Sequence, residues 1–172
     1  MNVEIERKFK IDNYEELKDT VESLGAEKKG LKTTIDYYFN VPQEQARTKY
    51  LRIRFDQNEK SGELAYHEVV DDLQTNEWET VVGDASLTQE ILEKLGFPFE
   101  VKVQKERTKY NFMEAEILLD KVDGLGEFVE IEAPDQSILN EIVQKLGINE
   151  ENVVSGLGYP DMIKEKHSAI SE

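Results

Sequence analysis

The feature that most constrains the fold is a strict alternation of apolar and charged residues close to the N-terminus. Val3, Ile5 and Phe9 alternate with the charged residues Glu4, Glu6 and Lys8, and Arg7, at an apolar position of the pattern, is expected on the outer face. Successive side chains of a β-strand point to opposite faces, so this period of two predicts a strand with one apolar and one charged face. Taken alone, the pattern is typical of any sheet that has one face in water.

Three later segments repeat the alternation, each with two charged residues that are two positions apart. Their alternate positions include the apolar residues Ile53, Val129 and Ile131. The charged pairs are Arg52 and Arg54, Lys105 and Arg107, and Glu130 and Glu132.

Two arrangements of these strands are open. The charged faces could lie outside a barrel that apolar side chains fill, or they could point inward while helices cover the apolar faces. Buried charges are very costly unless they pair or hold ions. Carboxylates two residues apart are suitable ligands for Mg²⁺ or Mn²⁺, and arginines are suited to bidentate contact with phosphate. A polyphosphate with its metal ion would satisfy both signs, which favours the inward arrangement.

Periodicity and turn signals predict about eight strands and three helices. The predicted helix caps and glycine stops are Asn13 and Gly25, Ser86 and Gly96, and Asp135 or Ser137 with Gly147. The strand candidates are 3–9, 35–41, 50–55, 64–70, 77–82, 100–112, 114–121 and 127–133, with loops at 42–48 and 57–62 and a turn near Asn111. We therefore expect one α+β domain over residues 1–172, built as a closed or nearly closed antiparallel barrel, with a frayed tail over 165–172.

Composition narrows the function classes. The net charge is −16, which argues against nucleic acid and anionic membranes as partners but leaves room for a small basic pocket. The chain has no cysteine, which excludes disulfides, thiolate metal sites and a cysteine nucleophile, and fits the cytoplasmic location that we expect. No apolar run approaches the roughly 20 residues that a membrane helix needs. The oligomeric state is left open, a homodimer included.

The ordered motifs resemble those of the CYTH proteins, the triphosphate tunnel metalloenzymes. The short Glu4-Ile5-Glu6-Arg7-Lys8 signature is weak by itself, but further motifs follow it in family order along nearly the whole chain. These are Asp36-Tyr37-Tyr38-Phe39, Leu51-Arg52-Ile53-Arg54, Glu77-Trp78-Glu79, Lys105-Glu106-Arg107, the run from Leu119 to Glu132, and Gly158-Tyr159-Pro160-Asp161-Met162-Ile163.

The resemblance implies an eight-stranded antiparallel β-barrel that forms a charged tunnel, with about three helices outside and Mg²⁺ or Mn²⁺ as cofactor. The metal ligands that it implies are Glu4, Glu6 and Glu130, with Glu132 as an additional acidic contributor. The triphosphate contacts are Lys8, Arg52, Arg54, Lys105 and Arg107, with His67 at a position where the family often has lysine. Asp120 on the tunnel wall and Lys8 are implied in catalysis.

The resemblance is nearest to class IV adenylyl cyclases, which convert ATP into cyclic AMP and pyrophosphate. Two alternatives remain: a triphosphatase that hydrolyses thiamine triphosphate or inorganic tripolyphosphate, and a non-catalytic binder of nucleotide or polyphosphate. The implied partner is accordingly ATP or another organic or inorganic triphosphate. Two departures from the family pattern reduce the number of positive charges expected in the tunnel. They are His67 in place of a lysine, and the absence of an arginine near Thr75 and Asn76.

Overall fold

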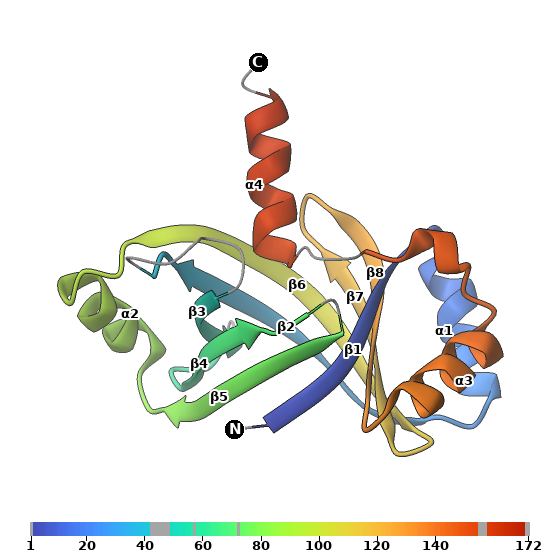
Figure 1. Ribbon diagram of the computed structural model, residues 1–172. Helices are drawn as coiled ribbons and strands as arrows, with labels where there is room; N and C mark the ends of the chain where they lie inside the picture. The colour runs from blue at the N-terminus through green and yellow to red at the C-terminus, as the bar shows by residue number, and fades with distance from the viewer. Residues whose placement is uncertain (1, 42–48, 57, 72, 155–157, 171–172) are drawn as a thin grey trace.

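Eight antiparallel strands close into a barrel in the computed structural model, which describes residues 2–41, 49–56, 58–71, 73–154 and 158–170, without the side chains of 2–4 and 170. The predicted loop 42–48 and residue 57 lie outside the described residues. The order around the barrel is β1-β5-β4-β3-β2-β6-β7-β8 (Figure 1). The strands are β1 (Asn2–Ile11), β2 (Glu27–Phe39), β3 (Lys49–Asp56), β4 (Gly62–Val69), β5 (Gln74–Val82), β6 (Phe99–Phe112), β7 (Ala115–Val122) and β8 (Gly126–Ala133).

The alternation in the sequence gives the barrel its two faces. On β1, Lys8 is buried on the inner face, while the neighbouring Phe9 is fully buried under helices on the outer face. The registers of neighbouring strands place inward side chains beside one another, with Lys8 opposite Glu130 and Glu6 opposite Glu132. The inward arrangement of the charged faces is therefore confirmed for the described side chains.

Three predicted helices are present, and two of their predicted caps are confirmed. Asn13 caps α1 (Tyr14–Ser23), and Asp135 caps α3 (Gln136–Leu146). The predicted cap Ser86 of the second helix is wrong, because the carboxylate of Asp84 accepts the Leu87 N–H, and α2 (Ala85–Lys94) begins two residues earlier than a cap at Ser86 would place it. An aspartate in extended conformation satisfies the unpaired N–H groups of the first turn as well as serine does.

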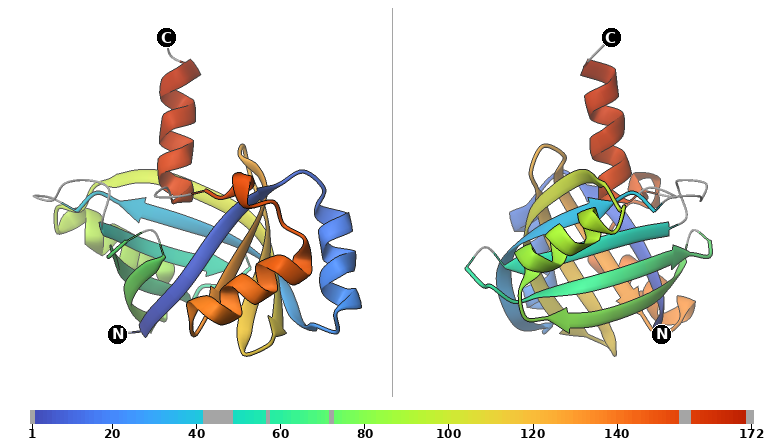
Figure 2. Two further views of the ribbon diagram at one scale, coloured as in Figure 1. Left: turned by 45° about the vertical axis from the view of Figure 1, so that its right-hand side comes forward. Right: turned by 90° about the vertical axis from the view of Figure 1, so that its left-hand side faces the viewer.

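A fourth helix, α4 (Tyr159–Ile170), follows the short 3₁₀ turn at Glu150–Asn152 and was not predicted. It begins against the barrel and projects away from it (Figures 1 and 2). Residues 165–170, part of the tail for which fraying was expected, continue this helix. Residues 171 and 172 lie outside the described part of the chain.

Apolar side chains cover the barrel in three clusters. The largest lies between α1, α3 and the outer faces of β1, β6, β7 and β8, and a second lies beneath α2 on the opposite flank (Figure 2). In the third, Tyr159 and Ile163 of α4 pack with Phe128, Val103 and neighbouring residues. Each fully buried aliphatic or aromatic side chain contributes about 1.5–3 kcal/mol, so the helices stabilise a barrel whose interior is polar.

The β6–β7 hairpin turns at Met113 and Glu114, between the two predicted strands and close to the turn expected near Asn111. The strands remain paired through Asn111 with Glu116 and Phe112 with Ala115. Both turn residues have positive φ, 52° and 62°, as a tight two-residue hairpin turn requires. Side chains other than glycine and asparagine seldom adopt this conformation, so residue type alone did not identify the two turn positions.

Candidate active site

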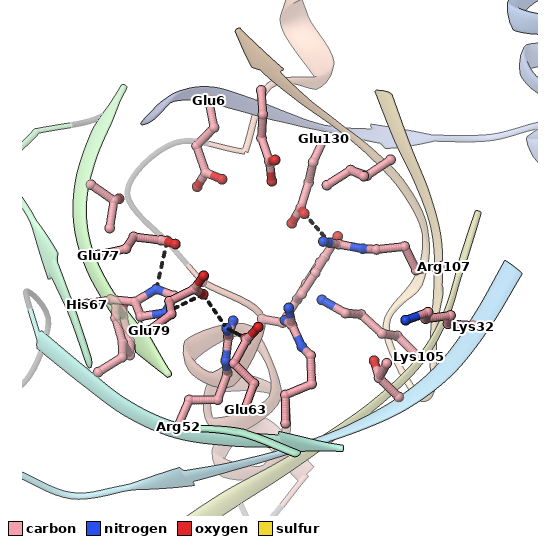
Figure 3. A pocket seen from close by; sticks show the side chains of 18 of the residues that line it. Glu6, Lys32, Arg52, Glu63, His67, Glu77, Glu79, Lys105, Arg107 and Glu130 are labelled. Carbon is pink, nitrogen blue, oxygen red and sulfur yellow. Dashed lines mark hydrogen bonds and ion pairs between the residues drawn. The ribbon is translucent and has the colours of Figure 1, made fainter. Parts of the chain in front are cut away.

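A cavity of about 870 Å³ runs through the barrel, and charged side chains from all eight strands line it. Looking into it, Figure 3 shows acidic and basic residues gathered on different sides. We call the lining of β7, β8, β1, β5 and β4 the acidic side, where Glu6, Glu130, Glu77 and Glu79 lie. We call the lining of β3, β2 and β6 the basic side. Its cations are Lys29, Lys32, Arg52, Arg54, Lys105, Arg107 and Lys109.

Two arginines of the basic side are each held by a buried aspartate. Asp36 of β2, only 1% exposed, accepts two hydrogen bonds from Arg54 at 2.7 and 2.8 Å. Asp120 of β7, 0% exposed, accepts two from Arg107 at 2.7 and 2.6 Å. Fork-to-fork pairing of this kind fixes the orientation of the guanidinium plane. Both arginines therefore present their remaining N–H groups in a fixed direction.

Asp120 makes a further contact with the first residue of α4. Its Oδ2 accepts a hydrogen bond from the Tyr159 hydroxyl at 3.0 Å, in addition to that from Arg107. Lys8 and Lys105 lie over the Tyr159 ring, with Nζ 4.2 and 5.2 Å from its centroid. α4 thus supplies a side chain that ties two predicted triphosphate contacts to the catalytic candidate Asp120.

Lys105 lies among more positive charge than the two nearby aspartates neutralise. Its Nζ is 3.7 Å from Asp36 and 3.9 Å from Asp120, but both aspartates already hold arginines. Burial, together with the positive charges of Arg107 and Arg54, lowers the pKa of Lys105 to about 8. Neighbouring positive charges that lower the pKa of a lysine this far favour the binding of an anion at the same place.

On the acidic side, carboxylates face one another across neighbouring strands. Glu6 of β1 stands opposite Glu132 of β8, which in turn stands opposite Glu116 of β7. Burial raises the pKa of Glu6; the charges of Glu130 and Glu77 add to this, and Lys8 opposes it. Like charges directly opposite on paired strands are destabilising unless a cation lies between them. This row is therefore suited to a bound cation.

Glu130 and Lys8 connect the acidic row to the basic side. Glu130 pairs with Lys8 at 3.1 Å and accepts a hydrogen bond from Arg107. Burial would raise the pKa of Glu130, but the charges of Arg107 and Lys8 hold it well below its usual range. Burial would likewise lower the pKa of Lys8, but Glu130 and Glu6 raise it. Lys8 therefore remains an ammonium group at neutral pH.

The residues present fit a divalent cation at this row. Carboxylate oxygens are the ligands that Mg²⁺ and Mn²⁺ prefer, and Glu6 and Glu132 offer them from opposite positions on two strands. Burial, and after it the charges of Glu130 and Glu77, raise the pKa of Glu6, and a cation at this row would favour its ionised form. The side chain of Glu4 lies outside the described residues, although its backbone pairs with Thr75 of β5.

β4 and β5 carry a smaller group of side chains at the other end of the acidic side. His67 Nδ1 lies 3.0 Å from Glu77, and His67 Nε2 lies 4.0 Å from Glu79. Arg52 contacts Glu79 at 3.2 Å and Glu63 at 2.7 Å, so two carboxylates share one guanidinium. Burial and the charge of Glu63 raise the pKa of Glu79, although Arg52 opposes this.

The structure brings nearly all the predicted site residues to one cavity. The predicted residues that line it are Glu6, Lys8, Arg52, Arg54, His67, Lys105, Arg107, Glu130 and Glu132. Asp120 is buried behind them and contacts three residues of the lining, Arg107, Tyr159 and Lys105. Arg7, predicted on the outer face, does not line the cavity and hydrogen-bonds Glu150 outside the barrel, as that prediction requires.

Sequence reasoning missed several residues of the site, among them Asp36, Tyr159, Glu77 and Glu79. All four lie within motifs that carried the family resemblance, so the signal was present without an assigned role. For Glu77 and Glu79, their alternation on either side of Trp78 could have indicated an inward face.

The comparisons with known proteins agree with this geometry. The model of the CYTH domain matches residues 2–157. The chain belongs to the CYTH domain family. A protein of Methanocaldococcus jannaschii named "putative adenylate cyclase" is 26% identical over 164 residues, a stretch that includes 88% of this chain and 94% of that protein.

Solved structures share the CYTH fold of this chain over most of its length. The PH1012 protein of Pyrococcus horikoshii OT3 is 30% identical, with a TM-score of 0.84 over 92% of this chain and 98% of that one. The "putative adenylyl cyclase HpAC1" of Hippeastrum, reported to have a dominant triphosphatase activity, is 16% identical. Its TM-score is 0.62 over 86% of this chain and 89% of that one, a likeness of fold alone.

No helix within the described residues is long and apolar enough to cross a bilayer.

Proposed function

We propose that this CYTH protein is a divalent-metal-dependent enzyme that acts on a triphosphate, with conversion of ATP into cyclic AMP and pyrophosphate as the first candidate reaction. The observation that carries the proposal is the convergence of Arg54, Lys105 and Arg107 in the cavity lining, opposite a row of carboxylates; burial and the charges of the two arginines lower the pKa of Lys105 there. A metal-bound triphosphate supplies the charges that both sides require.

The basic side binds and orients the triphosphate. Arg54 and Arg107, locked by Asp36 and Asp120, offer donors at fixed positions, so little reorganisation is needed when phosphate charge develops. Lys105 gains a full counter-charge from phosphate, which restores its proton affinity. Asp120 acts as a positioning residue, because its oxygens accept hydrogen bonds from Arg107 and Tyr159.

The acidic side holds the metal ion through Glu6, Glu130 and Glu132, and through Glu4 by the family resemblance. When bound, Mg²⁺ or Mn²⁺ supplies Lewis-acid stabilisation of charge on the reacting phosphate. Lys8 stands between this row and the basic side as a permanent ammonium group, suited to phosphate contact and not to proton abstraction at neutral pH.

In the cyclase reaction the ribose 3′-oxygen attacks the α-phosphorus, the bond from that phosphorus to the α–β bridging oxygen breaks, and pyrophosphate leaves. The hydroxyl proton passes to solvent or buffer. Arg54, Lys105 and Arg107 stabilise the charge that accumulates on pyrophosphate. The name of the M. jannaschii relative supports this reaction, whereas the activity reported for the Hippeastrum protein makes hydrolysis of the terminal phosphate the second candidate.

Identification of the products tests the proposal. Purified protein is incubated with ATP, thiamine triphosphate or tripolyphosphate, each with Mg²⁺, with Mn²⁺ or with chelator. Equal amounts of cyclic AMP and pyrophosphate from ATP, dependent on metal, are expected; orthophosphate from any of the three identifies the hydrolase instead. Binding of all three without turnover would overturn the proposed catalysis and leave the triphosphate-binding role.

A further inference from the structure

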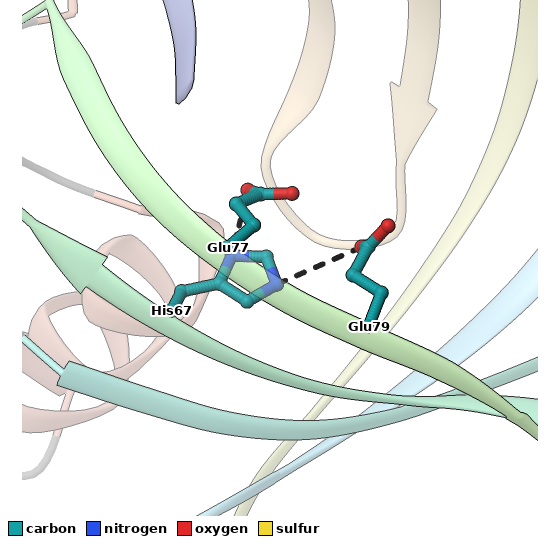
Figure 4. A group of neighbouring side chains, drawn as sticks. All are labelled: His67, Glu77 and Glu79. Carbon is teal, nitrogen blue, oxygen red and sulfur yellow. Dashed lines mark ion pairs between the residues drawn. The ribbon is translucent and has the colours of Figure 1, made fainter. Parts of the chain in front are cut away.

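We propose that His67, Glu77 and Glu79 form a second metal site, separate from the row of Glu6 and Glu132, that binds a divalent ion such as Zn²⁺, Mn²⁺ or Co²⁺. Figure 4 shows both carboxylates turned toward the imidazole ring from β5, across the β4–β5 ladder. One ligand atom of each residue lies within 4.8 Å of those of the other two. The inference goes beyond the proposed function, which does not require this site.

The hydrogen bonding of the ring leaves its other nitrogen available to a metal. His67 stands directly opposite Glu77 in the β4–β5 register, and Nδ1 lies 3.0 Å from that carboxylate. A carboxylate only accepts, so Nδ1 carries the proton and donates it. In the neutral ring Nε2 then carries a lone pair, the arrangement in which a carboxylate orients a metal-binding histidine.

Nε2 has no hydrogen-bond partner among the described residues, although it is buried from solvent. A buried polar atom without a partner costs about 1–3 kcal/mol, so such atoms point to a missing ligand. Glu79 lies 4.0 Å away on the same side, close enough for an ion to bridge the two after a small adjustment. Glu77 lies beside the ring at Nδ1, and one of its carboxylate oxygens is within 4.8 Å of the ligand atoms of His67 and Glu79.

The local charge favours a cation. Glu63, Glu77 and Glu79 surround this part of the wall, and Arg52 is the counter-charge paired with both Glu63 and Glu79. A divalent ion on Glu77 and Glu79 balances the excess. Imidazole with two carboxylates suits zinc and late transition metals, whereas Mg²⁺ prefers oxygen alone and keeps its waters.

The chain contains only two histidines, His67 and His167, which makes the test direct. In protein labelled with nitrogen-15 at histidine, correlation spectra show each ring separately and report its tautomer. We expect His67 in the Nδ1–H form without metal, and one equivalent of Zn²⁺ to shift its Nε2 resonance while His167 is unchanged. A tenfold excess of Mg²⁺ over protein should not reproduce the shift.

Isosteric variants assign the ligands. Glu77→Gln keeps a hydrogen-bond acceptor for Nδ1–H, and Glu79→Gln keeps the shape of the side chain; each should weaken Zn²⁺ binding at least about tenfold. Glu106→Gln makes the same change on the outer face of β6, and Glu132→Gln makes it in the other metal row; both should leave the His67 response within about threefold of the wild type. Matching amide spectra and unfolding midpoints show that each variant is folded.

Several results would overturn the site. The first is a His67 ring that is protonated at Nε2 and not at Nδ1. The second is a His67 Nε2 resonance that Zn²⁺ does not shift, or shifts no more than that of His167. The third is a Zn²⁺-induced shift at His67 that survives both Glu77→Gln and Glu79→Gln. An equal response to Mg²⁺ would overturn the assignment to zinc-class metals. These readouts involve no triphosphate and no turnover, so their failure is distinguishable from failure of the proposed enzyme activity.

Discussion

The basic and acidic sides of the tunnel differ in how their charges are satisfied. On the basic side, Arg54 and Arg107 are clamped by aspartates that are 1% and 0% exposed, and these pairs are complete without a ligand. On the acidic side, Glu6 and Glu79 have raised pKa values, to which burial and neighbouring carboxylates contribute. One side is organised before a ligand arrives, and the other needs a cation to relieve its repulsion.

The difference shows why a buried carboxylate can stabilise the fold on the basic side and serve function on the acidic side. Removing one partner of a buried, complete pair leaves an unpaired charge, which is strongly destabilising. Removing one of several crowded carboxylates relieves repulsion and costs little or no stability. Substitutions on the two sides should therefore separate folding from activity.

The largest effect is expected from Arg107→Ala on the basic side. It leaves Asp120 and Glu130 buried without their guanidinium, a loss of about 3–5 kcal/mol in the free energy of unfolding. Urea unfolding followed by circular dichroism measures it. The matched control is Lys109→Ala, on the same strand as Arg107. It breaks the half-exposed pair of Lys109 with Glu116 of β7 and should cost about 0–1 kcal/mol. Equal losses in the two variants would show that the buried pair is not organised as described.

Glu6→Gln on the acidic side should have the opposite profile. Turnover with Mg²⁺ should fall at least about 100-fold, because a direct metal ligand contributes no less than the groups that orient one. Its free energy of unfolding should stay equal to the wild type or rise, since Glu6 stands opposite Glu132. The matched control is Glu106→Gln, on the outer face of β6. Retained turnover in Glu6→Gln would remove Glu6 from the metal site, and lost stability would break the contrast between the two sides.

Much of this contrast was visible in the sequence, because the alternation of side chains along a strand assigns each charged residue to one of its two faces. It predicted the inward face of Glu6, Lys8, Arg52 and Arg54, and the structure confirms that all four line the cavity. The partners could not be predicted, because they depend on strand order. β1 lies between β8 and β5, strands far along the chain, and only that closure brings Glu132 and Glu77 to either side of Glu6.

The elements that sequence missed also depend on tertiary contacts. Residues 159–170 lack a strong apolar period, yet Tyr159 and Ile163 are held by Phe128 and Val103 at the end of the barrel, and this fixes the first turns of α4. Asp36 resembled an ordinary strand residue until the β2–β3 register placed it opposite Arg54. In both cases the deciding interaction is with a different element of the fold, which local propensity does not report.

An intermediate effect is expected from pH, through Lys105. Its pKa is lowered to about 8, and a bound triphosphate favours the protonated form. Affinity for α,β-methylene-ATP with Mg²⁺, measured by calorimetry, should therefore be constant below pH 7 and fall about tenfold per unit above pH 8. Lys105→Met should bind more weakly at pH 7 and lose the slope. An undiminished slope in that variant would assign the titration to another group.

The smallest effect is expected from Glu63→Gln, where two carboxylates share one guanidinium. Arg52 keeps Glu79 at 3.2 Å when Glu63 is neutralised, and Glu63 is 35% exposed, so the free energy of unfolding should change by less than about 1 kcal/mol. The pKa of Glu79 should fall, because the charge of Glu63 helps to raise it. Carbon-13 titration of the Glu79 carboxyl measures this. A loss of stability as large as that of Arg107→Ala would mean that the carboxylates of the acidic side are also held in complete pairs. Neither the row of Glu6 and Glu132 nor the His67 site would then need a cation to balance its charge.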